Sequence, residues 1–269
     1  MAVWNADDPY IVAAVLSSVN EKNLAGVLAS VFKESGDKGP PAVVLSQLLR
    51  MAAAMKNDKA MIALFESATT PKDGKFSRWQ FEVVAGYYDN PIKLEPVIQN
   101  RITETQTAAV RVAADAKANE SDRIAALRVI GRGDDLTDAE QAIFSSLLSP
   151  IASPALRTAA VDHLGRMNAE GARGLLIQTW KTQTPTTRTQ ILDVLLARKK
   201  GAFILVCALM AKSIAAGEID AARRQRLLTH ADAKVRERAA KVFDGAVNAD
   251  RAKVIAQYAE MPKGDAIKG

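Results

Sequence analysis

The sequence predicts an all-α protein, a solenoid of stacked helical hairpins, because one helical unit repeats along residues 121–196. Three arginines each precede a small or aliphatic residue by three positions and a large apolar residue by seven. These triplets are Arg123, Ala126 and Ile130; Arg157, Ala160 and Leu164; and Arg188, Ile191 and Leu195. On a helix such offsets share one face, so each arginine flanks an apolar stripe. We therefore expect one buried helix face in every unit.

Helix-start signals recur at nearly the same interval as the arginines. Ser121, Ser153 and Thr184 are predicted N-caps spaced 32 and 31 residues apart, and a proline follows each of the last two. A second set of predicted caps, Thr137 and Asn168, is separated by 31 residues. Two helices per fixed period are typical of an α-solenoid. We expect one continuous solenoid with an irregular part over residues 1–120 and a regular part over residues 121–269.

The first 120 residues are expected to form helices without a clear repeat. Asp8, followed by a proline, is predicted to cap the first helix, and residues 69–77 are predicted to be a loop. Further helices are expected over 23–32, 42–55, 58–65, 78–88 and 94–118, the last range holding one or two. Predicted core residues of the first and last of these helices are Tyr10, Ile11, Val15, Val19, Ile98, Ile102 and Val110. Trp79 and Tyr87 at helical spacing favour core positions, although aromatic side chains can also form a ligand surface.

The regular part is expected to consist of hairpins with recognisable ends. Gly131 follows the first helix as a left-handed C-cap, and Thr137 begins a capping box for the partner helix. Residues 202–211 are apolar on every side, which predicts a helix buried on most of its circumference. The arginine pattern returns in Arg236, Ala239 and Phe243, and a last helix is expected after Asn248.

Composition excludes several classes of protein. With 48% hydrophobic and 25% charged residues the chain is globular rather than disordered. Its single cysteine excludes an internal disulfide and a thiolate metal cluster. No run approaches the ~20 apolar residues of a membrane span, and the acidic start of the chain predicts no export signal there.

The net charge of +6 and the pI of about 9.4 invite a nucleic-acid interpretation. Lys and Arg are nevertheless mixed with Asp and Glu along the chain, apart from short clusters at 198–200 and 223–226. Such clusters are usually solvated helix ends. Residues 198–200 are expected at a helix C-terminus, where cations complement the macrodipole. The charge pattern therefore makes nucleic acid an unfavoured partner.

The residues able to carry chemistry are expected to be structural. His163 lies beside a predicted core position, His230 precedes a cap, and Cys207 lies in an apolar run. The aspartate pairs at 7–8 and 134–135 fall in a cap and a turn, where Asp is favoured for its own hydrogen bonds. The repeated arginines are interpreted as donors to neighbouring helix ends rather than as the lining of a ligand groove. No catalytic, cofactor-binding or metal-ligating residue is predicted, and we do not expect an enzyme.

The repeat, with a proline near the helix start and an Arg-x-x-Ala-x-x-x-Leu core, resembles HEAT-type repeats. Its units are shorter than the ~40–47 residues usual for that class, so we use the term HEAT-like. The resemblance implies a right-handed α-solenoid.

A second resemblance concerns the C-terminal third. Residues 217–220, 226–239 and 251–258, and the ending Gly264-Asp265-Ala266-Ile267-Lys268-Gly269, carry it. They are similar to the helical region before the haem-binding domain of large multidomain c-type cytochromes. These are putative membrane-bound dehydrogenases of the planctomycete–verrucomicrobium type. In that family a sugar-dehydrogenase-like β-propeller often comes first and HEAT-like repeats follow. A Gly-Asp-x-x-x-Gly segment then opens a cytochrome domain that bears CxxCH.

This resemblance covers roughly residues 121–269, and the chain contains no CxxCH. It therefore implies a haem-less part of such a protein, with a periplasmic location and with adjacent domains or a protein as partner. The leading expectation is a non-catalytic scaffold that holds a dehydrogenase domain and a c-type cytochrome domain at fixed separation for electron transfer, or docks a protein partner on its concave face.

Two other hypotheses remain open at this point. One is a nucleic-acid-binding HEAT-like protein similar to alkylpurine DNA glycosylases, motivated by the basic charge, Trp79, Trp180 and scattered aspartates. It predicts Lys and Arg gathered on one concave face and binding that weakens steeply with salt. The other is a free-standing protein–protein adaptor.

Overall fold

The computed structural model describes residues 7–36, 39–89, 96–169 and 171–244. Within these ranges the chain is helical apart from turns and loops, and it contains no β-strand. The predicted all-α class is therefore confirmed for the described residues. The chain divides into two compact units. Unit 1 runs to His163 and includes residues 167–169, and unit 2 comprises residues 164–166 and the described residues from Gly171.

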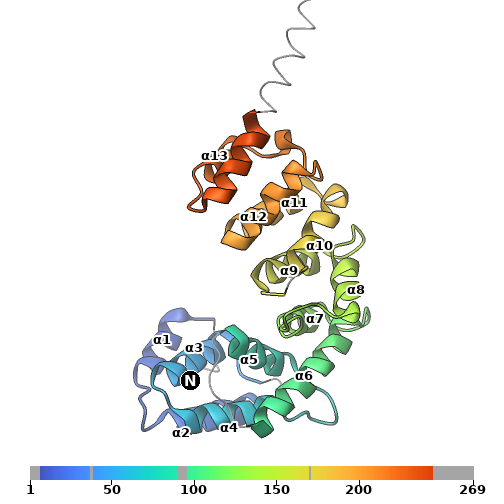
Figure 1. Cartoon of the computed structure of the whole chain (residues 1–269). Helices are drawn as coiled ribbons and strands as arrows, with labels where there is room; N and C mark the ends of the chain where they lie inside the picture. Colours follow the sequence, from blue (N-terminus) through green and yellow to red (C-terminus); the bar gives the residue numbers. More distant parts are fainter. Residues whose placement is uncertain (1–6, 37–38, 90–95, 170, 245–269) are drawn as a thin grey trace, which may run out of the picture. The chain divides into compact units, whose positions relative to one another are not determined.

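Unit 1 contains helices that pack on their next-but-one neighbours. They are α1 (Pro9–Ser17), α2 (Leu24–Ser35), α3 (Ala42–Ala54), α4 (Asp58–Ala68), α5 (Arg78–Asp89), α6 (Pro96–Ala114), α7 (Glu120–Leu127), α8 (Asp138–Leu147) and most of α9 (Pro154–Arg166). The next-but-one contacts join α1 to α3, α2 to α4, α3 to α5, α4 to α6, α5 to α7 and α6 to α8 (Figure 1). Odd-numbered and even-numbered helices thus form two rows within this unit.

Local helix-start chemistry is predicted well at several positions. Asp8 accepts hydrogen bonds from the backbone of Tyr10 and Ile11 and is followed by a proline at the first helical position. Thr137 and Glu140 form the predicted capping box of α8. Ser153 caps α9, and Thr184 caps α11 (Pro185–Leu196), each through its own hydroxyl.

Two of the predicted caps are wrong. Helix α7 begins at Glu120, and Asn119 is its cap, because the Asn119 side chain accepts from the backbone N–H of Ser121. Helix α10 begins at Ala172 after Gly171, whose φ of 65° is in the left-handed region, so Asn168 lies outside the helix. At α7 the cap lies two residues before the predicted one, while at α10 Gly171 makes no side-chain cap hydrogen bond, so the backbone path and not the cap chemistry sets that start.

The buried face of α1 differs from the predicted one. Tyr10 is 85% exposed and Ile11 and Val15 are half-buried, whereas Val12 and Leu16 are buried together with Val19. Helix α1 is apolar on almost every side, so its pattern does not define one stripe. The neighbouring helix, and not the sequence of α1, selects which side is buried.

The middle of unit 1 agrees in part with expectation. The described part of the range 94–118, from Pro96 on, contains one 19-residue helix, α6. Ile98 and Ile102 are buried as predicted, but Val110 is only half-buried and Ala109 takes the core position. The expected loop over 69–77 is present, and a turn at Asp73 and Gly74, both with positive φ, closes it.

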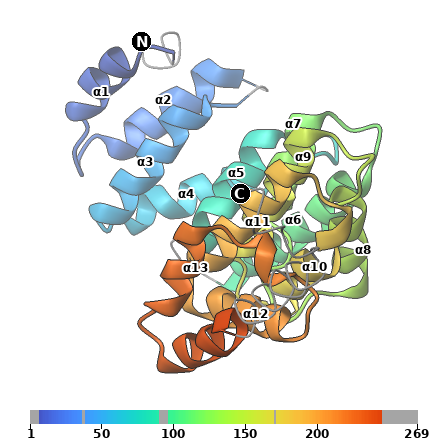
Figure 2. The same ribbon diagram turned by 90° about the horizontal axis from the view of Figure 1, so that it is seen from above.

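Within unit 2, taken by itself, α10 (Ala172–Gln178) and α12 (Lys199–Met210) also pack as next-but-one neighbours. The elements of unit 2 are the end of α9, α10, the short 3₁₀ helix η2 (Trp180–Thr182), α11, α12, η3 (Ala216–Glu218), α13 (Ala221–Leu228) and a helix over 233–244. Helix α13 lies along α11 (Figure 2): the Arg223 guanidinium bonds Asp193 at 2.6 Å, and the Arg226 guanidinium donates to the carbonyl of Leu196. The helix over 233–244 lies along α12, where Arg238 donates to Cys207 Sγ at 3.0 Å.

The basic cluster at 198–200 lies at a helix start, not at the predicted C-terminus. Arg198 is the N-cap residue of α12, and Lys199 and Lys200 are in its first turn. Their charges oppose the macrodipole of α12. Lys199 is balanced by an ion pair with Asp232 at 3.1 Å. The cluster at 223–226 lies within α13, and Asn248 and the segments 251–258 and 264–269 lie outside the described residues.

The apolar positions that follow the repeat arginines are buried in all four sequence repeats. They are Ala126, Ile130, Ala160, Leu164, Ile191, Leu195, Ala239 and Phe243. Helix α7 ends at Leu127, so Ile130 lies in the turn that follows and not on the helix face. The run over 202–211 is mostly buried as expected, although Met210 is exposed. No helix among the described residues is long and apolar enough to cross a bilayer.

Candidate functional site

Each of the four repeat arginines donates hydrogen bonds to backbone carbonyls that precede its own helix. The acceptors are Ala113 O for Arg123; Pro150 O and Ala152 O for Arg157; Trp180 O and Lys181 O for Arg188; and His230 O and Ala231 O for Arg236, at 2.6–3.1 Å. We call these contacts the arginine joints. Carbonyls at a helix end and in the following connection lack helical partners, and a guanidinium supplies several charge-assisted donors. The arginines therefore connect helix ends, as the sequence interpretation expected.

The two tryptophans cited for nucleic-acid binding are engaged within their own units. Trp180 is 1% exposed, and its indole N–H donates to the carboxylate of Glu218 at 3.1 Å. Arg188 pairs with the same carboxylate at 2.6 Å and lies over the Trp180 ring. Trp79 is half-buried and packs against the Phe32 ring, with 5.0 Å between ring centroids. The buried Trp180 ring is therefore not free to stack on a base, whereas Trp79 keeps part of its surface exposed.

His163 is a buried structural histidine. Its Nε2 lies 3.0 Å from the carbonyl oxygen of Ile130, and its ring packs near that of Phe144. Burial lowers the pKa of His163 to about 4, because the charged imidazolium would lose its hydration, and this outweighs the hydrogen bond to Ile130. The neutral ring holds the turn after α7 against α9.

This buried histidine predicts a pH dependence of stability. Its pKa in the folded state lies below the value of 6.5 for a free imidazole, so the unfolded chain binds the proton more tightly. The contribution of neutral His163 to the free energy of unfolding is fully present above pH 6.5. It decreases by up to about 3 kcal/mol as the pH falls towards 4. Urea unfolding between pH 7.5 and pH 4 should show this loss. H163Q, which retains an amide donor but does not titrate, should lack it; equal losses in both proteins would contradict the interpretation.

The remaining predicted structural residues have the following environments. The backbone N–H of Asp232 donates to His230 Nδ1 at 3.1 Å, so that ring acts as an acceptor at a helix start. The apolar run around Cys207 predicts a buried side chain, but Cys207 is only half-buried, and its Sγ accepts from Arg238 at 3.0 Å. Asp134 and Asp135 are exposed in the turn before α8. The structure brings none of these residues together.

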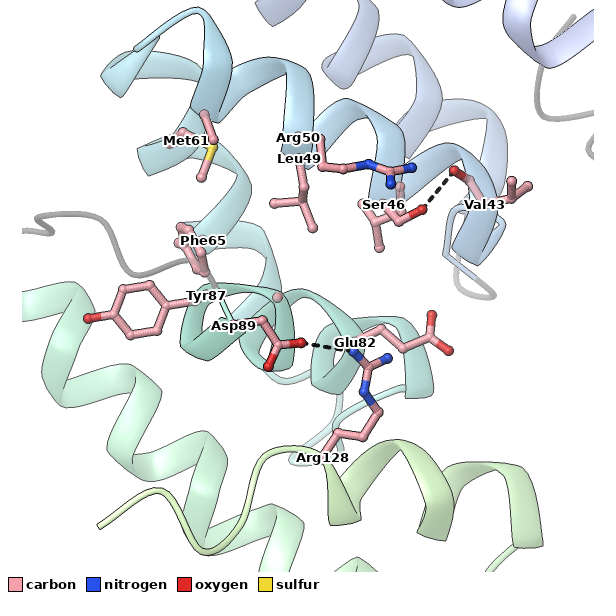
Figure 3. A pocket seen from close by; sticks show the side chains of 13 residues that line it. Val43, Ser46, Leu49, Arg50, Met61, Phe65, Glu82, Tyr87, Asp89 and Arg128 are labelled. Atoms are coloured by element: carbon pink, nitrogen blue, oxygen red, sulfur yellow. Dashed lines mark hydrogen bonds and ion pairs between the residues drawn. The ribbon is translucent and has the colours of Figure 1, made fainter. Parts of the chain in front are cut away.

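Unit 1 contains a cavity of about 560 Å³ that sequence reasoning missed (Figure 3). Helices α3, α4 and α5 and the end of α7 line it. Its apolar wall is made by Leu45, Leu49, Ala53, Met61 and Phe65, and its polar edge by Ser46, Arg50, Glu82, Tyr87, Asp89 and Arg128. In Figure 3 Leu49 extends from α3 towards α5, and Glu82, Asp89 and Arg128 lie on the opposite side from Arg50. The volume and the mixture of apolar and polar groups are typical of small-molecule pockets.

The charged groups of this cavity are not equally available. Glu82 pairs with Arg78 at 2.8 Å, and Asp89 accepts from Arg128 at 3.2 Å and from Arg132 at 3.3 Å. Arg132 also lies over the Tyr88 ring, whose burial raises the pKa of Tyr88 to about 12. Arg50, in contrast, makes no hydrogen bond or ion pair with the described part of the chain. The cavity therefore presents an available guanidinium, while both carboxylates are already neutralised.

No protein-family model, no curated protein and no solved structure matches this chain. The resemblance to the helical region of multidomain c-type cytochromes thus stays a prediction from the quoted segments. Within the described ranges no three His, Cys, Asp or Glu residues form a group that could hold a metal ion.

Proposed function

We propose that this chain is a non-catalytic scaffold, a right-handed α-solenoid of HEAT-like hairpins. The recurrence of the arginine joint carries this proposal. The four repeat arginines occupy equivalent places in successive sequence repeats. Each makes the same kind of contact with a preceding helix end, as Arg123, Arg157, Arg188 and Arg236 show. The next-but-one packing within each unit supports it too, because hairpins stacked in one direction place each helix beside the second helix after it.

The solenoid is tested by X-ray scattering in solution. A compact globular chain of 269 residues would have a radius of gyration of about 18 Å. A row of stacked hairpins is longer, so we expect a clearly larger value together with a rod-like scattering profile at intermediate angles. A value near 18 Å with a globular profile would contradict the solenoid.

We further propose that the scaffold belongs to a periplasmic multidomain c-type cytochrome and separates a dehydrogenase domain from a haem domain, or docks a protein partner between them. The resemblance of residues 217–220, 226–239 and 251–258 supports this role. In such a protein the repeats carry no electrons themselves and fix the distance between the redox centres.

A haem stain of the native gene product tests the cytochrome proposal. An antibody raised against this chain should detect a band that also retains covalently bound haem on a denaturing gel. The isolated chain should show no shift of the haem Soret band on titration with haemin. An antibody-reactive native band without haem, or haem binding by the chain alone, would contradict the proposal.

One observation favours nucleic-acid binding as a second candidate function. Residues 171–244 hold 14 Lys and Arg against 6 Asp and Glu, a net charge of +8, whereas residues 1–170 hold 18 against 21. Much of this basic excess is engaged internally, as in Arg188, Arg223 and Arg226. The candidate predicts DNA binding whose logarithmic affinity falls linearly with the logarithm of salt concentration. A duplex that does not bind at low salt would exclude it.

A further inference from the structure

The charged side chains along the cavity of unit 1 favour an anionic ligand over a cationic one. A cationic ligand would have to share each carboxylate with an arginine that already pairs with it, Glu82 with Arg78 and Asp89 with Arg128 and Arg132. An anionic ligand would meet the Arg50 guanidinium, which has no competing partner in the described chain. The cavity thus selects for negative charge even though acidic and basic residues are both present along its edge.

The apolar wall specifies the rest of the ligand. Leu45, Met61 and Phe65 are buried, while Leu49 and Ala53 are half-buried. Leu45, Leu49 and Ala53 are spaced four residues apart, so they lie on one side of α3. A volume of about 560 Å³ accommodates a small aliphatic or aromatic body in contact with this wall. Figure 3 shows Arg50 and Leu49 on the same helix, so one ligand can contact both.

We propose that this cavity binds a small organic carboxylate, with its apolar body against Leu49, Met61 and Phe65 and its carboxylate on Arg50. The proposal is independent of the scaffold role, because it requires only the described side chains of α3, α4 and α5. It assigns a binding function to the irregular part of the chain, residues 1–120, which lies outside the repeats with the arginine joints.

Three compounds with the same apolar body test the charge selection. Phenylbutyrate, phenylbutanol and phenylbutylamine are titrated into the full chain with labelled methionine methyl groups, and the Met61 resonance is followed by NMR. We expect phenylbutyrate to shift this resonance saturably and to bind about tenfold more tightly than the alcohol, as one charge-assisted hydrogen bond would give. The amine should bind no better than the alcohol. Equal affinities of acid and alcohol, or no response of Met61, would overturn the proposal.

Substitutions locate the binding. R50Q should remove the tenfold advantage of the acid and leave the affinity for the alcohol unchanged. R111Q, which removes an exposed arginine of α6 outside the cavity, should bind as the unaltered protein does. A53L, which fills part of the cavity from α3, should weaken all three compounds while the circular dichroism spectrum stays helical. Undiminished acid binding by R50Q or by folded A53L would overturn the proposal.

Discussion

G201A is expected to destabilise the protein by about 3 kcal/mol or more, as overpacking at a backbone contact does. Gly201 lies in the first turn of α12, directly above the last turn of α11, because only Ala197 and Arg198 connect the two helices. A Cβ at this position would lie 2.2 Å from the carbonyl oxygen of Leu195 and 2.9 Å from its Cα. These are backbone atoms, so no side chain can rotate away and the two helices must separate.

The matched control is G174A. Gly174 lies inside α10, and a Cβ there would have no atom within 4 Å. Since alanine loses less conformational entropy in a helix than glycine, G174A should stabilise by about 0.5–1 kcal/mol. Urea unfolding followed by circular dichroism compares the two variants. If G201A unfolds at the same midpoint as G174A, the close approach of α11 and α12 is not present.

R157A is expected to have the second largest effect, a loss of about 3 kcal/mol. Arg157 is 8% exposed, and one of its terminal nitrogens donates to two carbonyls, Pro150 O and Ala152 O, both at 2.8 Å. Alanine would remove this charged donor from both carbonyls of the connection from α8 to α9, and a part-buried hydrogen bond to a charged group contributes about 1.5–3 kcal/mol. The removed side chain also leaves a void beneath the connection.

R236A is the natural comparison, because Arg236 also donates to two carbonyls but is exposed. Water can replace an exposed donor, so R236A should cost less than about 1 kcal/mol. R157K keeps the charge but not the planar donor group and should fall between R157A and the unaltered protein. Thermal or urea unfolding gives the order. Equal losses in R157A and R236A would show that burial does not determine the strength of the arginine joints.

The sequence predicts well those features that depend on neighbouring residues. The capping box of Thr137 and Glu140 and the caps at Asp8 and Ser153 require only a polar side-chain oxygen within three positions of the backbone N–H groups that donate to it. The arginine joints are also predictable, since an arginine just inside a helix lies close to the connection that precedes it. Such contacts repeat because the local sequence repeats.

Features that depend on tertiary packing were predicted less well. The apolar stripe of α1 is ambiguous in the sequence, and contact with α3 is consistent with Val12 and Leu16 being buried in place of Tyr10. Residues 198–200 follow one helix and begin another, and the two-residue connection places them in the second. The cavity has no local signal: Leu49 and Met61 look like ordinary core positions in the sequence, and only the packing of α3, α4 and α5 brings them to one cavity.

The most direct test of the proposed scaffold role is to translate the native reading frame that follows the codon for Gly269. The account predicts a CxxCH motif within the next few dozen codons, because the Gly264-Asp265 segment resembles the start of a c-type haem domain. Finding it would identify the repeats as a spacer within an electron-transfer protein. A stop codon directly after Gly269, or a downstream domain without CxxCH, would contradict this role.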